Sequence, residues 1–451
     1  DTNPDVLAFH EAFADIVALF QHFTYPEVLK NQIAATRGNL ASQNLLGKLA
    51  QEFGIAIGGY SSLRDAIGSY DKDGKWTPTE PKGDEYRKVF KPHDRGAILV
   101  AAVFEAFLSI YKNRIADLLR LATGGTGVLP IGEISPDLVN RLSAEAAKSS
   151  RHVLNMCIRA LDYCPPVDIT FGDFLRAVIT ADSDLVPDDN RDYRIAFISA
   201  FRRRGIYPSG AKQILLDTIG YTTPATTELQ KVFTIIAEFL RDYRNEIIYA
   251  KDRESIFNIT RKYVAGTYEE EEKVYGLHRR LKFKYDESIA FERLTGLMFN
   301  FNYGDLGIRT SSAYGSSGPA FAINSLHYAS RVGPDGKTNN QIVVSLVQHA
   351  RVELNAEKKA VGTSDETKGT VVSGGCTLIF DLDSLSLKYA ISKPLLDVDQ
   401  INHYVYQLDQ KRISQLLKYQ NQSMADESRF NAYFRMKMNP VNEPFNFLHN
   451  H

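Results

Sequence analysis

The sequence predicts an α+β fold, in which a mostly helical first part precedes a part with an antiparallel sheet. Two observations support this prediction. Apolar side chains recur at helical spacing through residues 1–222, between turn-forming stretches. Residues 341–354 and 376–391 instead alternate apolar and polar side chains and are rich in β-branched residues, which is typical of strands.

The chain of 451 residues is long enough for two or three domains with substantial cores. We assign residues 1–222 to a helical part, residues 223–254 to a connecting helix, and residues 255–451 to an α+β accessory part of unknown role. The sequence contains no internal repeat. No apolar run approaches the roughly 18 residues that a membrane-spanning helix needs, so we expect no membrane partner.

The first helices are predicted from their apolar spacing and from the residues that stop them. One is expected over residues 5–23, ending before Tyr25-Pro26, and a second over 40–53. After a polar, turn-rich stretch, a long apolar helix is expected over 95–122, where the sequence "TGGTG" ends it.

Three further helices have local start or stop signals. Ser135-Pro136 predicts the N-cap and first turn of a helix that reaches about Tyr163. Thr170 is expected to cap a helix over 171–185, and Gly205 to close the last one. Among the strands, residues 334–337 predict a hairpin turn, and 358–375 a long mobile loop.

Charge and cysteine content exclude several classes of protein. The formal net charge is -1, from 53 Lys+Arg and 54 Asp+Glu, so no bulk attraction to nucleic acid or anionic membranes is expected. Cys157, Cys164 and Cys376 are too few for a disulfide framework, and we expect buried thiols. Such usage favours a reducing, cytoplasmic compartment only weakly, and the compartment stays unassigned.

The first predicted helix carries two carboxylates one turn apart. Glu11 and Asp15 are spaced i and i+4, so they project from the same face. Apolar residues occupy the other face: Phe9, Phe13, Val17 and Phe20. From the residues alone, a solvent-exposed pair is the simpler interpretation, since buried carboxylates need a cation or hydrogen-bond donors.

The segment "HEAFAD" around these carboxylates resembles the N-E-x-x-S-D motif of the thermolysin-like gluzincin metallopeptidases. In that family the zinc ion is held by H-E-x-x-H on one helix and by a glutamate on the next. The resemblance places Glu11 at the third zinc ligand. It places Asp15 at the aspartate that accepts a hydrogen bond from a zinc-bound histidine.

Further segments resemble the same family, in its order. "YSSLRDAIGSYD" is similar to S-L-R-x-M-x-D-P, which places Arg64 at the arginine that contacts the substrate carbonyl. "PHDRGAILVAAVF" is similar to V-H-x-N-S-G-I-x-N-x-A-F-Y, which places His93 at the histidine that stabilises the oxyanion. The helices expected after Thr170 resemble the family's closing helices, so the resemblance covers residues 1–207.

The resemblance implies a zinc-dependent endopeptidase that acts on a peptide or protein substrate. No pair of histidines in the chain forms H-E-x-x-H, so two zinc ligands and the general-base glutamate are absent from it. Because Glu11 lies so close to Asp1, we expect that motif just upstream, or on a separate N-terminal fragment. The zinc site of this chain is therefore expected to be incomplete.

Departures from the family's pattern leave two other interpretations open. His10 and Ala14 replace the usual asparagine and serine of the motif. His22 stands where relatives often carry a calcium-ligating glutamate, so we expect no calcium site. The chain is alternatively an inactive gluzincin scaffold that serves as a binding or regulatory module, or a helical scaffold whose matches are accidental.

Residues 255–451 resemble no family. The acidic run Glu269–Glu272 is interpreted as a solvated surface, and His449 and His451 as part of a frayed tail. Core packing is the favoured interpretation of a group of aromatic residues: Phe283, Tyr285, Phe299, Phe301 and Tyr303.

Overall fold

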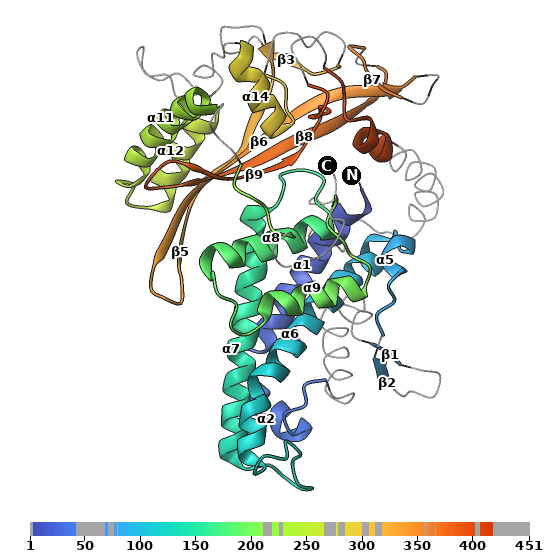
Figure 1. Ribbon diagram of the computed structural model, residues 1–451, viewed down its shortest axis with the longest axis vertical. Coiled ribbons are helices and arrows are strands. Elements are labelled where there is room, and N and C mark those ends of the chain that lie inside the picture. The colour runs from blue at the N-terminus through green and yellow to red at the C-terminus, as the bar shows by residue number, and fades with distance from the viewer. Residues whose placement is uncertain are drawn as a thin grey trace, which may run out of the picture.

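The computed structural model describes residues 3–41, 80–210 and 229–265, most of 285–417, and short pieces at 68–70, 76–78, 219–224 and 277. Its architecture is α+β, as the sequence predicts: a bundle of helices followed by an antiparallel sheet with its own helices (Figure 1). Glu269–Glu272, His449 and His451 lie outside the described residues, as does most of the helix expected over 40–53.

The helical part is built around one long helix. α6 (Pro92–Ala122) packs against α1 (Pro4–His22), α7 (Pro136–Ala160) and α9 (Tyr193–Arg203). The shorter helices of this part are α2 (Pro26–Thr36), α5 (Glu85–Lys88) and α8 (Phe171–Leu185), with a 3₁₀ turn, η1 (Leu161–Tyr163), and a small hairpin of β1 (Gly68–Tyr70) and β2 (Trp76–Pro78).

The sheet has the strand order β5-β6-β8-β9, and all its pairs are antiparallel. Its strands are β5 (Ala322–Val332), β6 (Thr338–Leu354), β8 (Thr370–Asp381) and β9 (Leu387–Lys393), and the short β7 (Ala360–Gly362) pairs with the end of β6. A separate two-stranded pair joins β3 (Thr310–Ser311) to β4 (Gly318–Pro319). Among the described residues of this part, the labelled helices are α11 (Gln230–Ile247), α12 (Arg253–Ala265) and α14 (Tyr285–Thr295), and residues 410–417 are also helical.

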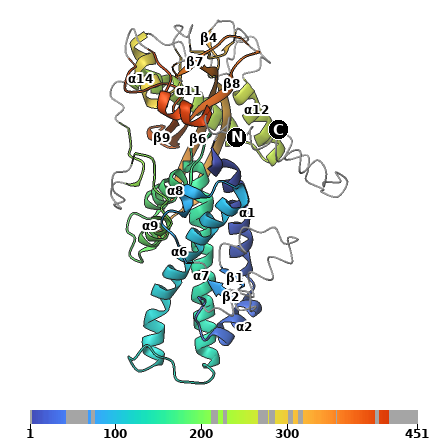
Figure 2. The same cartoon turned by 90° about the vertical axis from the view of Figure 1, so that its right-hand side faces the viewer.

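The sheet is covered on both faces. Ile342, Val344 and Leu346 point to one face and share a core with α11 and α12. The alternate residue Val343 points to the other face and, with Ile379, joins the core of the helical part. Successive side chains of a strand point to opposite faces, so β6 reads as a nearly continuous buried run. Figures 1 and 2 show the sheet lying over the end of the helical part.

Local signals in the sequence predicted several helix ends and one turn correctly. The Ser135 hydroxyl accepts the Leu138 N–H at 3.3 Å, with Pro136 in the first turn of α7. Thr170 and Asp173 form a capping box at α8, so both orphan N–H groups are satisfied there. The turn at 334–337 joins β5 to β6.

One helix was missed and one prediction about local structure was wrong. The first helix ends at His22, before Tyr25-Pro26 as predicted, but Pro26 is also the first residue of the unpredicted helix α2, where a missing N–H costs nothing. The long loop expected over 358–375 is much shorter, since β7 and β8 occupy most of that range and Thr370 pairs with Val352. Of the aromatic group expected in the core, Phe299 is buried against Phe291. Phe301 and Tyr303 lie outside the described residues, and the side chains of Phe283 and Tyr285 do too.

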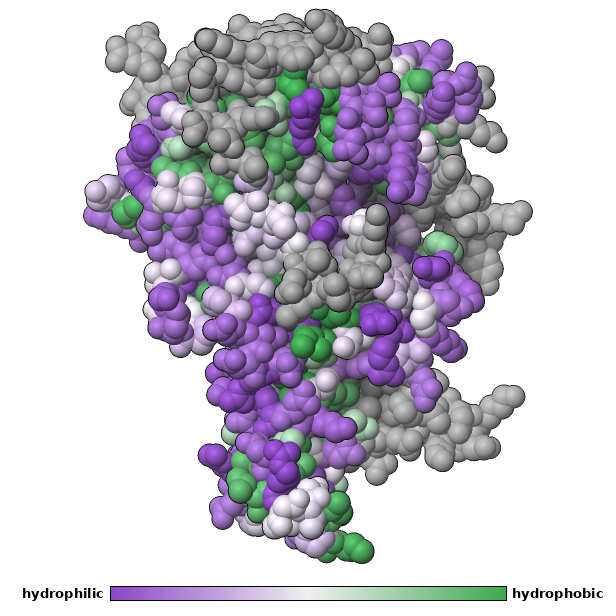
Figure 3. All heavy atoms as spheres, in the orientation of Figure 1, coloured by the Kyte–Doolittle hydropathy of each residue, from purple (hydrophilic) through white to green (hydrophobic). Residues whose placement is uncertain are grey.

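α6 is long and apolar enough to cross a membrane by length and composition, contrary to the expectation from sequence. α1 and α2 pass the same test only when they are taken together across a bend of 82°. In the fold, 72% of the apolar window of α6 is buried, which is typical of the core helix of a helical bundle. Apolar side chains are exposed where α6 ends and the chain turns into α7 (Figure 3). Leu121 lies in the last turn of α6, and Val128 and Ile131 lie in the connection to α7.

Candidate functional site

A close contact between α1 and α6 brings the two predicted site segments together. Gly96 lies in the first turns of α6, and a Cβ at this position would lie 3.1 Å from the carbonyl oxygen of Ala8 and 3.6 Å from the Cβ of Ala12. Glycine and alanine therefore let the two helices approach closely at the start of α6. The side chain of His93, one turn earlier, is placed beside the middle of α1 for this reason.

Glu11 and His93 face one another across this contact. The Nδ1 of His93 lies 3.4 Å from the Oε2 of Glu11, close enough for an ion pair when the imidazole is protonated. Both side chains remain accessible, with exposed fractions of 48% for Glu11 and 34% for His93. His93 is in the first turn of α6, where the helix dipole and unpaired N–H groups favour negative charge.

A second polar cluster fixes the start of both helices. Asp5 is buried, and its carboxylate accepts hydrogen bonds from the Arg95 guanidinium, from the Tyr86 hydroxyl at 2.5 Å and from the Phe171 N–H at 2.9 Å. Arg95 also donates to the carbonyl of Val89 at 2.5 Å and lies over the Tyr86 ring. Since Arg95 follows His93 by two residues, this cluster holds the beginning of α6 against α1.

The pKa of Tyr86 in this cluster is raised, first by burial and then by the charge of Asp5. The Tyr86 hydroxyl therefore keeps its proton at neutral pH and donates a hydrogen bond to the Asp5 carboxylate. The cluster has an internal partner for each of its charges. We interpret it as a support for the site rather than as a reactive group.

The structure brings together two of the four residues that the resemblance singled out. Glu11 and His93 are neighbours. Asp15 lies one turn beyond Glu11 on α1 and is partly buried, and Arg64 lies outside the described residues. His10 is exposed on α1, and the Nε2 of His22 lies 2.8 Å from the amide nitrogen of Gln32.

The described part of the chain does not by itself offer a complete metal site. No group of three or more His, Cys, Asp or Glu side chains within it could hold a metal ion. A catalytic zinc ion takes about three protein ligands and a water molecule. The accessible carboxylate of Glu11 fits one of these ligand positions, and the others would have to come from elsewhere.

The thiols are not part of this site. Cys157, Cys164 and Cys376 are free and buried, as the sequence predicted. Burial raises the pKa of Cys376 to about 12 and also raises the pKa of Cys157. A buried thiol that keeps its proton is a poor nucleophile and a poor metal ligand.

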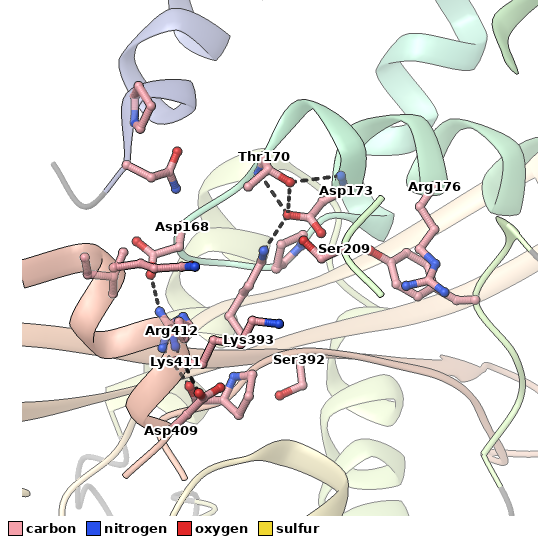
Figure 4. Close-up of a pocket in the computed structure, with 17 residues that line it drawn as sticks. Asp168, Thr170, Asp173, Arg176, Ser209, Ser392, Lys393, Asp409, Lys411 and Arg412 are labelled. Atoms are coloured by element: carbon pink, nitrogen blue, oxygen red, sulfur yellow. Dashed lines mark hydrogen bonds and ion pairs between the residues drawn. The ribbon is translucent and has the colours of Figure 1, made fainter. Parts of the chain in front are cut away.

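A cavity of about 520 Å³ lies where the helical part meets the sheet, near the starts of α1 and α8 (Figure 4). Its charges are largely paired. Lys393 of β9 lies 2.6 Å from a carboxylate oxygen of Asp173, and Arg412 pairs with Asp168. These contacts cross from the sheet part to the helical part, so the cavity belongs to the joint between them.

Sequence reasoning missed Asp5 and Arg95. Asp5 follows Asn3-Pro4, which gives only the pattern of a helix start, and Arg95 lies in the polar sequence before a long apolar run. Their burial depends on the packing of segments that are distant in the sequence. The only local signal is a pair of opposite charges, each near the start of a predicted helix.

Comparisons with known proteins add no relative. No protein-family model, no curated protein and no solved structure matches this chain. The geometry around Glu11 and His93 and the motifs that contain them are therefore what indicates a function.

Proposed function

We propose that this chain forms part of the active site of a zinc-dependent endopeptidase of the gluzincin type. The observation that carries the proposal is the contact between Glu11 and His93, at 3.4 Å, across two different helices. The two residues come from separate motifs, and the resemblance assigns both to one catalytic centre. An accidental match of either motif would not require the other to lie beside it.

The residues of this chain have distinct roles in the proposal. Glu11 supplies a carboxylate ligand, and its exposure leaves its oxygens accessible. His93 donates a hydrogen bond to the oxyanion that forms when the peptide carbonyl is attacked, and Arg64 contacts the same carbonyl oxygen. One such donor typically contributes about 3 kcal/mol to lowering the barrier.

Asp15 has a positioning role, because it would orient a histidine that comes from the H-E-x-x-H segment. That segment lies upstream or on another chain in this proposal, and it supplies the general base. Zinc, when bound, polarises the carbonyl and lowers the pKa of a water molecule. The substrate is a peptide or protein.

A second candidate is a gluzincin scaffold without catalysis, which binds or regulates a partner. One observation favours it: His10 and Ala14 replace the usual asparagine and serine of the family's motif. The gene sequence immediately before Asp1 separates the candidates, because H-E-x-x-H there supports the peptidase and its absence supports the binding module.

The biochemical test uses the complete gene product in a casein or peptide cleavage assay, with metal content measured in parallel. We expect cleavage that a zinc chelator abolishes. Glu11→Gln should lose both bound zinc and activity, because the amide is a weak ligand. His93→Gln should keep the zinc and lower kcat about 100-fold.

Glu27→Gln is the matched control, since Glu27 is an exposed carboxylate on the neighbouring helix α2. It should change neither zinc content nor activity. If Glu11→Gln keeps both zinc and activity, Glu11 is not a ligand and the peptidase proposal fails. A complete product that neither binds zinc nor cleaves peptides would favour the binding module.

A further inference from the structure

A second cavity, of about 450 Å³, opens between two helices and the sheet in the C-terminal part. α11 and α12 form one side of it, and β5 and β6 form the other. Its lining is mainly aliphatic, from Ile247, Ile248, Ile256, Leu326, Ile342 and Leu382. We call this cavity the α11–β5 pocket. Its size and composition are those of a typical small-ligand site, where apolar walls surround a few polar groups.

Three of the apolar side chains that line the α11–β5 pocket are exposed at its rim: Ile248, Ile256 and Tyr328. Ile248 is 61% exposed and Tyr249 is 82% exposed, at the corner between α11 and α12. Phe257 on α12 is 63% exposed, and Tyr328 on β5 is 44% exposed. Single exposed apolar residues are normal on a protein surface, but several at the rim of an apolar cavity are typical of a binding site.

The polar groups of the pocket differ in whether they already have partners. The Tyr243 hydroxyl lies 3.0 Å from the Thr260 hydroxyl, and His327 lies 3.0 Å from a carboxylate oxygen of Asp162. Arg244 donates from Nη1 to the carbonyl of Leu382 at 3.1 Å. Within the described ranges, no carboxylate forms an ion pair with Arg244. A guanidinium has five N–H donors, so Arg244 can also donate hydrogen bonds to the carboxylate of a ligand.

We propose that the α11–β5 pocket binds the C-terminal end of an apolar peptide. The last side chain enters the aliphatic cavity, and the free carboxylate pairs with Arg244. The preceding residues lie over the exposed apolar rim of the pocket, at Ile248, Ile256 and Tyr328. Because this rim faces the surface, it favours a peptide over a compact ligand such as a short fatty acid. The proposal does not depend on the peptidase activity.

The test measures binding of a fluorescein-labelled hexapeptide that ends in Ala-Leu-Phe, by fluorescence anisotropy. Its matched probe is the same peptide with a C-terminal amide, and a chelator is present so that hydrolysis cannot consume either probe. We expect the carboxylate peptide to bind at least about tenfold more tightly than the amide, because a charge-assisted hydrogen bond is lost in the amide.

Variants separate the charge from the apolar contact. Arg244→Gln should bind both probes equally and weakly, whereas Ile256→Asp should weaken both. Arg241→Gln is the control, since Arg241 is an exposed arginine on the same helix, and it should bind like the wild type. If Arg244→Gln does not fold, the difference in affinity between the carboxylate and amide peptides on the wild-type protein still tests the proposal.

Three results would overturn the proposal. The first is equal binding of the carboxylate and amide peptides by the wild-type protein. The second is an effect of Arg241→Gln as large as that of Arg244→Gln. The third is octanoate that binds more tightly than the peptide and displaces it, which would assign the pocket to an aliphatic acid instead.

Discussion

Asp5 and Glu11 are carboxylates on the same helix, less than two turns apart, and their surroundings differ completely. Asp5 is buried and accepts hydrogen bonds from Arg95, Tyr86 and Phe171. Glu11 is about half exposed and has the imidazole of His93 as its neighbour. The first carboxylate has several donors fixed around it, whereas the second has oxygens that a ligand or metal can still reach.

This difference separates, on one helix, a supporting residue from the residue that we propose as a metal ligand. A buried carboxylate with several donors contributes to stability, because removing it leaves a buried cation without a partner. An exposed carboxylate contributes little to stability, so little stability would be lost if Glu11 served as the metal ligand that we propose. The two residues can therefore be told apart by what their removal changes.

The largest expected effect is that of Asp5→Ala. Arg95 would remain buried without its carboxylate, so the free energy of unfolding should fall by about 3–5 kcal/mol. Urea unfolding followed by circular dichroism measures this value. Glu27→Ala, which removes an exposed carboxylate from α2, is the control and should change it by less than about 1 kcal/mol. A loss for Asp5→Ala as small as the control would contradict the supporting role.

A smaller effect, with a pH dependence, is expected at Asp184 in the joint between the two parts. Its carboxylate accepts hydrogen bonds from Tyr163 and Gln341, both at 2.6 Å, and pairs with Lys388 at 2.6 Å. Burial alone would raise the pKa of Asp184, but hydrogen bonds from Lys388, Tyr163 and Asn339 outweigh burial and lower it. Asp184→Asn should therefore cost about 2 kcal/mol at pH 7.

The sign of the pH dependence follows from that lowered pKa. The ionised Asp184 stabilises the folded protein above the ordinary carboxyl pKa, and this stabilisation is lost as the pH falls through the folded-state value. The difference in unfolding free energy between the wild type and Asp184→Asn should thus shrink on acidification. Urea unfolding at pH 7 and at pH 4 and below measures it, and a difference that grows toward low pH would contradict the assignment.

The smallest effect on stability is expected for Glu11→Gln. Because Glu11 is about half exposed and its neighbour His93 is also accessible, the free energy of unfolding should change by less than about 0.5 kcal/mol in the absence of metal. Thermal unfolding with a chelator present measures this. A large loss of stability would make Glu11 a structural residue like Asp5 and remove the contrast between them.

Much of the helical part could be predicted from the sequence because its signals are local. Ser135-Pro136 and Thr170 start helices through contacts within three residues, so α7 and α8 begin where the sequence predicts. The alternation in 341–354 and 376–391 predicted β6, β8 and β9. Pro26 shows the limit of such signals, since proline is compatible with both the end of one helix and the start of the next.

The site was predictable only in part. Helical spacing places Glu11 and Asp15 on one face, but only the resemblance connected Glu11 to the distant His93. The close approach that joins them depends on Gly96 meeting Ala8 and Ala12, and no pattern in either segment alone indicates which helices pack together. The same reason explains why the burial of Asp5 and Arg95 was missed.

The sheet that is buried on both faces has a consequence for how the chain is made. The helices of the first part leave the ribosome before β6 and β8 do, and the surface that later receives Val343 and Ile379 is uncovered until then. A product truncated before residue 338 would lack the strands that cover this apolar surface. It should therefore aggregate or bind chaperones. The division between helical and sheet segments along the sequence is therefore a poor guide to where the protein can be cut.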